Sequence, residues 1–97
     1  MKSGSESDSR RMICHFAGHV QGVGFRFTVR EIAARYDVSG YVTNLADGRV
    51  ELVMEGLESE MNRVLEDVKY KMRGYIEKMS SHFAAKTGEF RDFSIRH

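Results

Sequence analysis

The sequence predicts an α+β domain in which two helices cover one face of a mainly antiparallel sheet of four to five strands. Two segments carry apolar residues at i, i+3, i+4 and i+7, which is the spacing of one helix face. Shorter apolar runs typical of strands flank each of these segments. The resulting order is β-α-β-β-α-β with one further strand at the end. Two helices with one apolar face each pack on the same face of such a sheet, which gives a ferredoxin-like, or split β-α-β, sandwich.

The first half of the domain is predicted to contain a strand, a helix and a hairpin. The apolar run from Met12 to Ala17 predicts the strand, and the helical spacing extends over Arg26 to Asp37. Ser39-Gly40 then breaks the helix. Two strand-like runs follow, Tyr41 to Leu45 and Arg49 to Glu55. The Asp-Gly pair between them is typical of a β-hairpin turn.

The second half of the domain is predicted to contain a helix and two strands. The helix extends over Glu58 to Arg73, with acidic residues near its start and basic residues near its end, as the helix dipole favours. Gly74 is well placed to end it. Tyr75 to Ala84 predicts a fourth strand, and Phe90 to Ile95 predicts a short fifth strand.

The composition excludes several classes of protein. The chain has 97 residues, which fit one domain, and its 41% of hydrophobic and 30% of charged residues are typical of a folded soluble protein. A formal net charge of +1 leaves no broad basic surface for nucleic acid. Cys14 is the only cysteine, which excludes an intrachain disulfide and a cysteine-based zinc site. No apolar run reaches the length of a membrane span.

The start of the chain differs from the rest. Residues 1–10 are rich in serine, glycine and charge, so we expect a disordered tail followed by a folded domain over residues 11–97. The tail has no apolar signal core, and we expect a cytoplasmic protein. Cys14, in the first predicted strand, is interpreted as a small hydrophobic residue of the core.

The most informative segment is the glycine-rich loop Gly18-His19-Val20-Gln21-Gly22-Val23-Gly24-Phe25-Arg26. Three glycines within seven residues allow the backbone to curl, so that several N–H groups point into one concavity. Backbone donors, a helix N-terminus and a planar guanidinium together form a cradle for an oxyanion. The alternative is a turn that serves only chain geometry. The loop lacks the third glycine of a dinucleotide fingerprint and the Gly-Lys-Ser/Thr of a Walker A loop.

Two side chains near this loop are candidates for chemistry. Arg26 places a positive charge at a helix N-terminus, where it opposes the dipole, and a bound anion would remove that conflict. Asn44 lies in a predicted strand, where asparagine is unfavourable. It either caps its own turn or holds a water molecule through its carbonyl oxygen. The other histidines, His15, His82 and His97, show no metal-ligand spacing, and we expect structural or solvated roles for them.

The chain resembles the acylphosphatase family from about Arg11 to His97. Three segments carry the resemblance: the loop from Gly18 to Arg26, then Gly40-Tyr41-Val42-Thr43-Asn44-Leu45-Ala46-Asp47-Gly48-Arg49-Val50-Glu51, and finally Phe90-Arg91-Asp92-Phe93-Ser94-Ile95. The chain departs from the family pattern after the second helix, where Arg73-Gly74-Tyr75-Ile76 replaces a proline-containing stretch, and again over Ser80 to Glu89.

The resemblance implies a set of roles. Backbone amides of the loop would bind the phosphoryl group; they belong to His19, Val20, Gln21, Gly22, Val23, Gly24 and Phe25. Arg26 matches the phosphate-binding arginine, and Asn44 matches the asparagine that positions water. The reaction would be hydrolysis of a small acyl phosphate to a carboxylate and inorganic phosphate, by a monomer without metal or organic cofactor. No nucleic acid or membrane partner is implied.

Three alternatives are open at this point. The first is a module on the same fold that binds a phosphorylated ligand or a protein without turnover. The second is a carbamoyl-phosphate-processing unit of the kind found in larger carbamoyltransferases. The third is an RNA-binding variant of the fold, which would need exposed aromatic residues among basic ones on its central strands.

Overall fold

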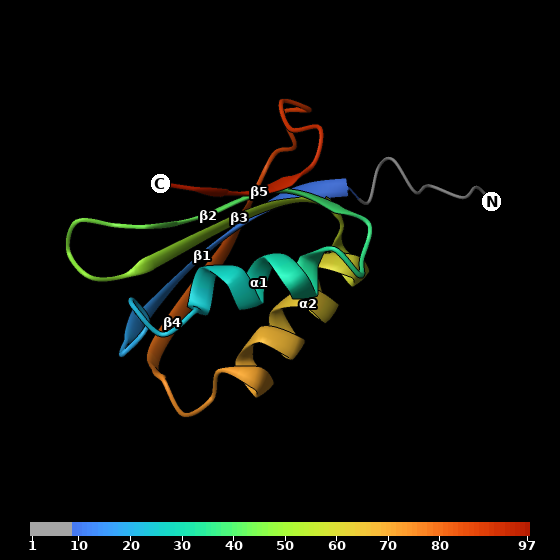
Figure 1. Ribbon diagram of the computed structural model, residues 1–97. Coiled ribbons are helices and arrows are strands. Elements are labelled where there is room, and N and C mark those ends of the chain that lie inside the picture. The colour runs from blue at the N-terminus through green and yellow to red at the C-terminus, as the bar shows by residue number, and fades with distance from the viewer. Residues whose placement is uncertain (1–8) are drawn as a thin grey trace.

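The computed structural model describes residues 9–97 and shows two helices packed against one face of a five-stranded sheet (Figure 1). The elements are β1 (Ser9–Gly18), α1 (Phe25–Ala33), β2 (Val38–Asn44), β3 (Val50–Leu57), α2 (Glu58–Lys71), β4 (Ile76–Ala84) and β5 (Phe93–Arg96). The strand order is β4-β1-β3-β2-β5, and every neighbouring pair is antiparallel except β2 and β5, which are parallel. The predicted element order and the ferredoxin-like class are confirmed.

Both ends of the first strand–helix unit differ from the prediction. β1 begins at Ser9 rather than Met12, because Ser9 and Arg10 pair with Leu57 and Gly56 of β3. Residues 9 and 10 therefore belong to the sheet and not to a tail; the rest of the predicted tail lies outside the described residues. The first helix ends at Ala33 rather than Asp37. The chain tightens there into hydrogen bonds of three-residue spacing, such as Arg35 N–H to the Ile32 carbonyl at 3.0 Å.

The remaining boundaries also shift by a few residues. β2 begins at Val38, so the predicted helix break at Ser39-Gly40 lies inside a strand. Gly40 is required there by close approach, since a Cβ atom would lie 1.9 Å from the Val53 carbonyl oxygen. β5 is shorter than predicted and begins at Phe93. The Phe90 ring instead packs edge-on against the Tyr41 ring, with 5.8 Å between centroids.

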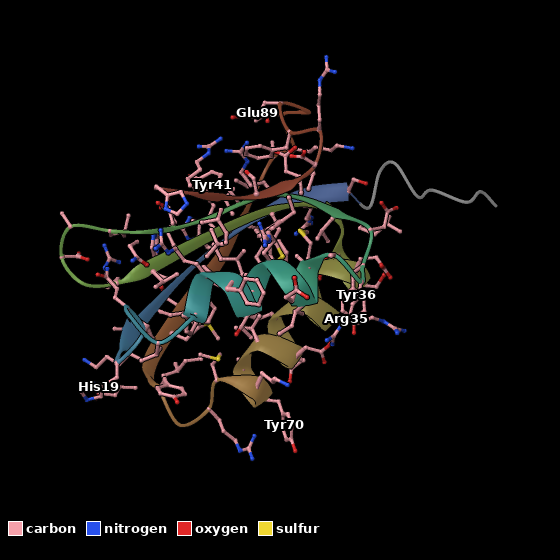
Figure 2. All side chains as sticks on the ribbon, viewed as in Figure 1. His19, Arg35, Tyr36, Tyr41, Tyr70 and Glu89 are labelled. Carbon is pink, nitrogen blue, oxygen red and sulfur yellow. The ribbon has the colours of Figure 1, made fainter. Side chains whose placement is uncertain are left out.

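The core lies between the sheet and the helices, where side chains fill the space (Figure 2). Residues of β1 alternate, so that Met12, Cys14 and Phe16 are buried on the helix side. Apolar residues of both helices pack against them, among them Val29, Ile32, Met61, Val64 and Val68. Cys14 is fully buried, as expected of a core residue, and burial raises the pKa of its thiol to about 12. The thiol therefore stays protonated and inert near neutral pH.

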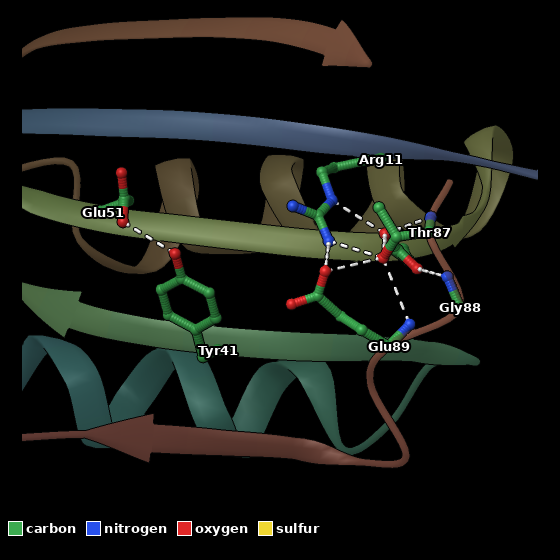
Figure 3. Close-up of polar contacts among 7 residues, drawn as sticks. Arg11, Tyr41, Glu51, Thr87, Gly88 and Glu89 are labelled. Carbon is green, nitrogen blue, oxygen red and sulfur yellow. Dashed lines mark hydrogen bonds and ion pairs between the residues drawn. The ribbon is translucent and has the colours of Figure 1, made fainter. Parts of the chain in front are cut away.

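A buried carboxylate on the opposite face of the sheet fixes the loop after β4 (Figure 3). Glu55 is only 2% exposed, and its Oε2 accepts hydrogen bonds from Arg11 Nε at 2.8 Å and from the Thr87 N–H at 2.9 Å. Its Oε1 accepts one from the Gly88 N–H at 3.0 Å. The Glu55 network thus anchors the loop that follows β4.

Replacement of Glu55 by glutamine is expected to lower the free energy of unfolding by about 3 kcal/mol at pH 7, because Arg11 and two N–H groups lose a buried charged acceptor. Burial alone raises the pKa of Glu55, but hydrogen bonds from Thr87, Arg11 and Gly88 outweigh it and hold this pKa below its ordinary value. The carboxylate thus stabilises the fold above the unfolded-state pKa, and this contribution is lost as pH falls through the folded-state pKa. Denaturant titrations from neutral to acidic pH should show the wild-type advantage shrinking below about pH 4.

A matched control for this prediction is Glu89→Gln. Glu89 also pairs with Arg11, at 2.8 Å, but its side chain is 55% exposed, so its loss should change stability much less. Equal unfolding midpoints for Glu55→Gln and the wild type at neutral pH would show that the buried network contributes no net stability.

Candidate active site

The glycine-rich loop connects β1 to α1 at one end of the sheet (Figure 1). Its start is fixed by a hydrogen bond from the His19 N–H to the Tyr75 carbonyl at 2.9 Å. Gly22 and Gly24 have φ angles of 78° and 77°, in the left-handed region that favours glycine. A Cβ atom at either position would meet nothing within 4 Å, so backbone conformation and not lack of space requires these glycines.

The loop presents a run of backbone donors without acceptors. Among residues 9–97, no protein group accepts a hydrogen bond from the N–H groups of residues 20–27. The first intrahelical bond of α1 is donated by the Thr28 N–H to the Gly24 carbonyl, at 3.0 Å. Gly24 is the N-cap of α1 and brings no side chain to satisfy these donors. A loop and a helix N-terminus with free donors are suited to binding an anion.

Side chains anchor the loop on two sides. Val20 and Phe25 are buried in the core, where the Phe25 ring lies 5.1 Å from the Phe16 ring, centroid to centroid. The Gln21 amide donates hydrogen bonds of 2.9 Å to the carbonyls of Leu45 and Arg49. Gln21 thereby ties the loop to the β2–β3 hairpin. Sequence reasoning gave Gln21 only a backbone role and missed this side-chain contact, because no local pattern reveals acceptors 24 and 28 residues away.

Arg26 lies in the first turn of α1 and is held by the segment at the end of β5. Its Nη1 donates a hydrogen bond to the Arg96 carbonyl at 3.3 Å and lies 3.2 Å from His97 Nδ1. The Thr43 hydroxyl donates to the same Arg96 carbonyl at 3.0 Å. A guanidinium carries five N–H groups, so these contacts orient Arg26 and leave donors for a ligand.

Asn44 is the last residue of β2, and its side-chain oxygen Oδ1 is buried. Within the described part of the chain, this oxygen has no hydrogen-bond partner. The hairpin turn is closed by other groups: the Leu45 N–H bonds to the Arg49 carbonyl at 2.8 Å, and the Arg49 N–H to Asp47 Oδ1 at 3.1 Å. The turn-capping interpretation of Asn44 therefore finds no contact to support it. A buried acceptor is costly unless a protein group, a water molecule or a ligand donates a hydrogen bond to it, so this oxygen calls for an explanation.

Arg26 and Asn44 both line one pocket, which has a volume of about 260 Å³. The other lining residues are Val20, Gly22, Gly24, Phe25, Phe27, Ile95 and His97. His19, Gln21 and Val23 do not line it, and the His19 side chain points away from the body of the molecule (Figure 2). Sequence reasoning missed Phe27 and Ile95. His97, for which a structural or solvated role was expected, also lies in the wall of the pocket.

Two further properties bear on the kind of site. Within residues 9–97, no group of three or more His, Cys, Asp and Glu side chains is arranged to hold a metal ion. No helix in this part of the chain is long and apolar enough to cross a bilayer. The candidate site therefore consists of backbone donors, one guanidinium, one amide oxygen and an imidazole. These groups define a class of protein that handles phosphate compounds on a ferredoxin-like scaffold.

Comparison with known proteins narrows this class. The acylphosphatase family profile matches residues 12–95. An acylphosphatase from Pyrobaculum islandicum is 42% identical over 83 residues, which cover 84% of this chain and 87% of the relative. One from Deinococcus radiodurans is 36% identical over 89 residues, 88% of this chain and 98% of the relative. The crystal structure of acylphosphatase from Bacillus subtilis superimposes with a TM-score of 0.81 at 30% identity, covering 91% of this chain and 99% of that one. The chain belongs to the acylphosphatase family.

Proposed function

We propose that this protein hydrolyses the carboxyl–phosphate bond of small acyl phosphates to a carboxylate and inorganic phosphate, with Arg26 and Asn44 as its catalytic side chains. Membership of the acylphosphatase family supports the reaction. One observation supports the residues: the unpartnered Asn44 Oδ1 lies in the same pocket as Arg26 and the N-terminus of α1. A site that only binds phosphate needs hydrogen-bond donors for the phosphate oxygens. A buried acceptor in such a site is instead suited to receive a hydrogen bond from a water molecule.

The phosphoryl group would lie against the loop amides and the Arg26 guanidinium. Charge on the three equatorial oxygens of a transferring phosphoryl group is stabilised by such preorganised donors. Their positions are fixed before substrate arrives, because Val20 and Phe25 anchor the loop in the core and Gln21 ties it to the hairpin.

Asn44 Oδ1 would accept a hydrogen bond from the attacking water and align it in line with the bond that breaks. The water oxygen forms the new P–O bond, and the carboxylate leaves with the electron pair of the old one. A carboxylate is a stable leaving group, so no general acid is needed. In this proposal a phosphate oxygen of the substrate takes the proton from water, since neither Asn44 nor Arg26 is a base.

The proposed enzyme needs only a small-molecule substrate and releases inorganic phosphate. We propose that it acts as a cytoplasmic monomer, with no nucleic acid or membrane partner. The proposed reaction uses no metal, because backbone donors and Arg26 take the place of a cation at the phosphoryl oxygens.

The experiment that tests this function is steady-state hydrolysis of benzoyl phosphate with chelator present. Turnover is expected under these conditions. Absence of turnover together with calorimetric binding of inorganic phosphate would instead support the non-catalytic phosphate-binding module. Activity that appears only after a divalent metal is added would contradict the proposed mechanism.

A further inference from the structure

Phe27 is an exposed aromatic residue at the rim of the candidate site. The buried stripe of α1 consists of Phe25, Val29, Ile32 and Ala33, whereas Phe27 is 55% exposed. Core packing therefore does not explain a large apolar side chain at this position. Phe27 and Arg26 both line the pocket of the candidate site, so Phe27 is within reach of a group attached to a phosphate bound at Arg26.

Phe27 lines two cavities. One is the pocket that contains Arg26 and Asn44, and the other is a groove of about 480 Å³ between α1 and α2. The α2 wall of this groove includes Tyr70, which projects from the last turn of the helix and is 69% exposed (Figure 2). Phe27 thus stands at the junction between the candidate phosphate site and a second, larger space.

The geometry of an in-line displacement indicates which side the acyl group occupies. The attacking water and the leaving group lie on opposite sides of the phosphorus atom. Asn44 belongs to β2 in the sheet, so a water held by it approaches from the sheet side. The leaving carboxylate then faces away from the sheet. The helix layer lies on that side (Figure 1).

We propose that the groove between α1 and α2 is the subsite for the acyl part of the substrate, with Phe27 as its specificity-determining residue. This inference rests on the proposed acyl phosphate hydrolysis. The preferred substrates are then acyl phosphates whose acyl group carries an uncharged apolar chain or ring long enough to extend past Phe27. Acetyl phosphate would occupy the phosphate site without reaching the groove.

The charged residues that line the groove favour an uncharged acyl group. Two of them are acidic, Glu31 and Asp67, and two are basic, Arg35 and Lys71, so the lining has no net charge. Asp67 already accepts a hydrogen bond from the Tyr36 hydroxyl at 2.6 Å. The Arg30 guanidinium lies 5.5 Å from the centroid of the Phe27 ring, which is a cation–π contact. An aromatic or branched acyl group would pack against this ring.

The test compares acetyl, benzoyl and 3-phenylpropionyl phosphate as substrates of the wild type and of Phe27→Ala. The ratio of kcat/KM for 3-phenylpropionyl over acetyl phosphate is expected to fall roughly three- to tenfold in the variant, which is the worth of one aromatic contact. Inhibition by inorganic phosphate should stay unchanged. Tyr70→Ala should lower kcat/KM for 3-phenylpropionyl phosphate but not for benzoyl phosphate. Phe83→Ala is the matched control, since Phe83 is 40% exposed but lies on β4, outside both cavities.

Hydrolysis of acetyl phosphate by the wild type tests the proposed function separately, because this substrate does not reach the groove. If the wild type hydrolyses acetyl phosphate but Phe27→Ala leaves the selectivity ratio unchanged, the subsite is wrong and the function stands. Equal losses on all three substrates, with weaker phosphate inhibition, would show that Phe27 supports the cradle and not the acyl group. Failure of the wild type on all three substrates would overturn both proposals.

Discussion

Replacement of Arg26 by alanine is expected to lower kcat for acyl phosphate hydrolysis by about 10²- to 10³-fold, the effect of removing one donor aimed at charge in a transition state. Arg26 is oriented by the Arg96 carbonyl and by His97, so its guanidinium is positioned before substrate binds. Inhibition by inorganic phosphate should weaken in parallel, because the product uses the same donor. Arg26→Lys should recover only part of the activity, since an ammonium keeps the charge but loses the planar fork.

The stability of the same variant should move in the opposite direction. A cation in the first turn of a helix opposes the dipole, and no acidic residue in the first turn of α1 compensates it. Arg26→Ala is therefore expected to raise the free energy of unfolding by a few tenths of a kcal/mol. Loss of activity with equal or higher stability separates a functional arginine from a structural one. Arg63→Ala, which replaces an exposed arginine on α2, is the control and should leave kcat near the wild-type value. A kcat for Arg26→Ala within about tenfold of wild type would contradict the assignment.

Sequence reasoning predicted the architecture because its signals are local. The helical spacing, the Asp-Gly turn and the glycines between elements can all be recognised within windows of a few residues. The order of the elements followed from these signals. The boundaries of helices and strands differ from the prediction where pairing with a distant strand determines them. Ser9 and Arg10 look like tail residues by composition, and they are strand residues only because β3 offers partners in register.

Some residues of the candidate site could likewise be predicted from the sequence, and others could not. Arg26 and Asn44 stand out in the sequence because each conflicts with its local structure, as a cation at a helix N-terminus and an amide in a strand. Gln21, His97 and the Glu55 network carry no such conflict. Their partners lie 24 to 71 residues away in the chain, so only the folded structure reveals them.

Replacement of Asn44 by alanine is expected to lower kcat about a hundredfold, which is the cost of a misplaced reactant. In contrast to Arg26→Ala, inhibition by inorganic phosphate should be unchanged, because Asn44 Oδ1 is an acceptor and the phosphate oxygens need donors. The two variants together thus separate water positioning from phosphate binding. Steady-state kinetics with benzoyl phosphate and product inhibition measure both quantities in the same assay.

The stability of the Asn44→Ala variant further tests whether Asn44 has a catalytic role or a structural one. The buried Oδ1 has no protein partner among residues 9–97, so alanine removes no protein hydrogen bond from this oxygen. Asn44→Ala is therefore expected to unfold close to the denaturant concentration that unfolds the wild type. Asn62→Ala, an exposed asparagine on α2, controls for the general effect of the substitution and should keep full activity. If Asn44→Ala lost phosphate inhibition together with kcat, its amide N–H would contact the phosphoryl group, and another acceptor would have to hold the water.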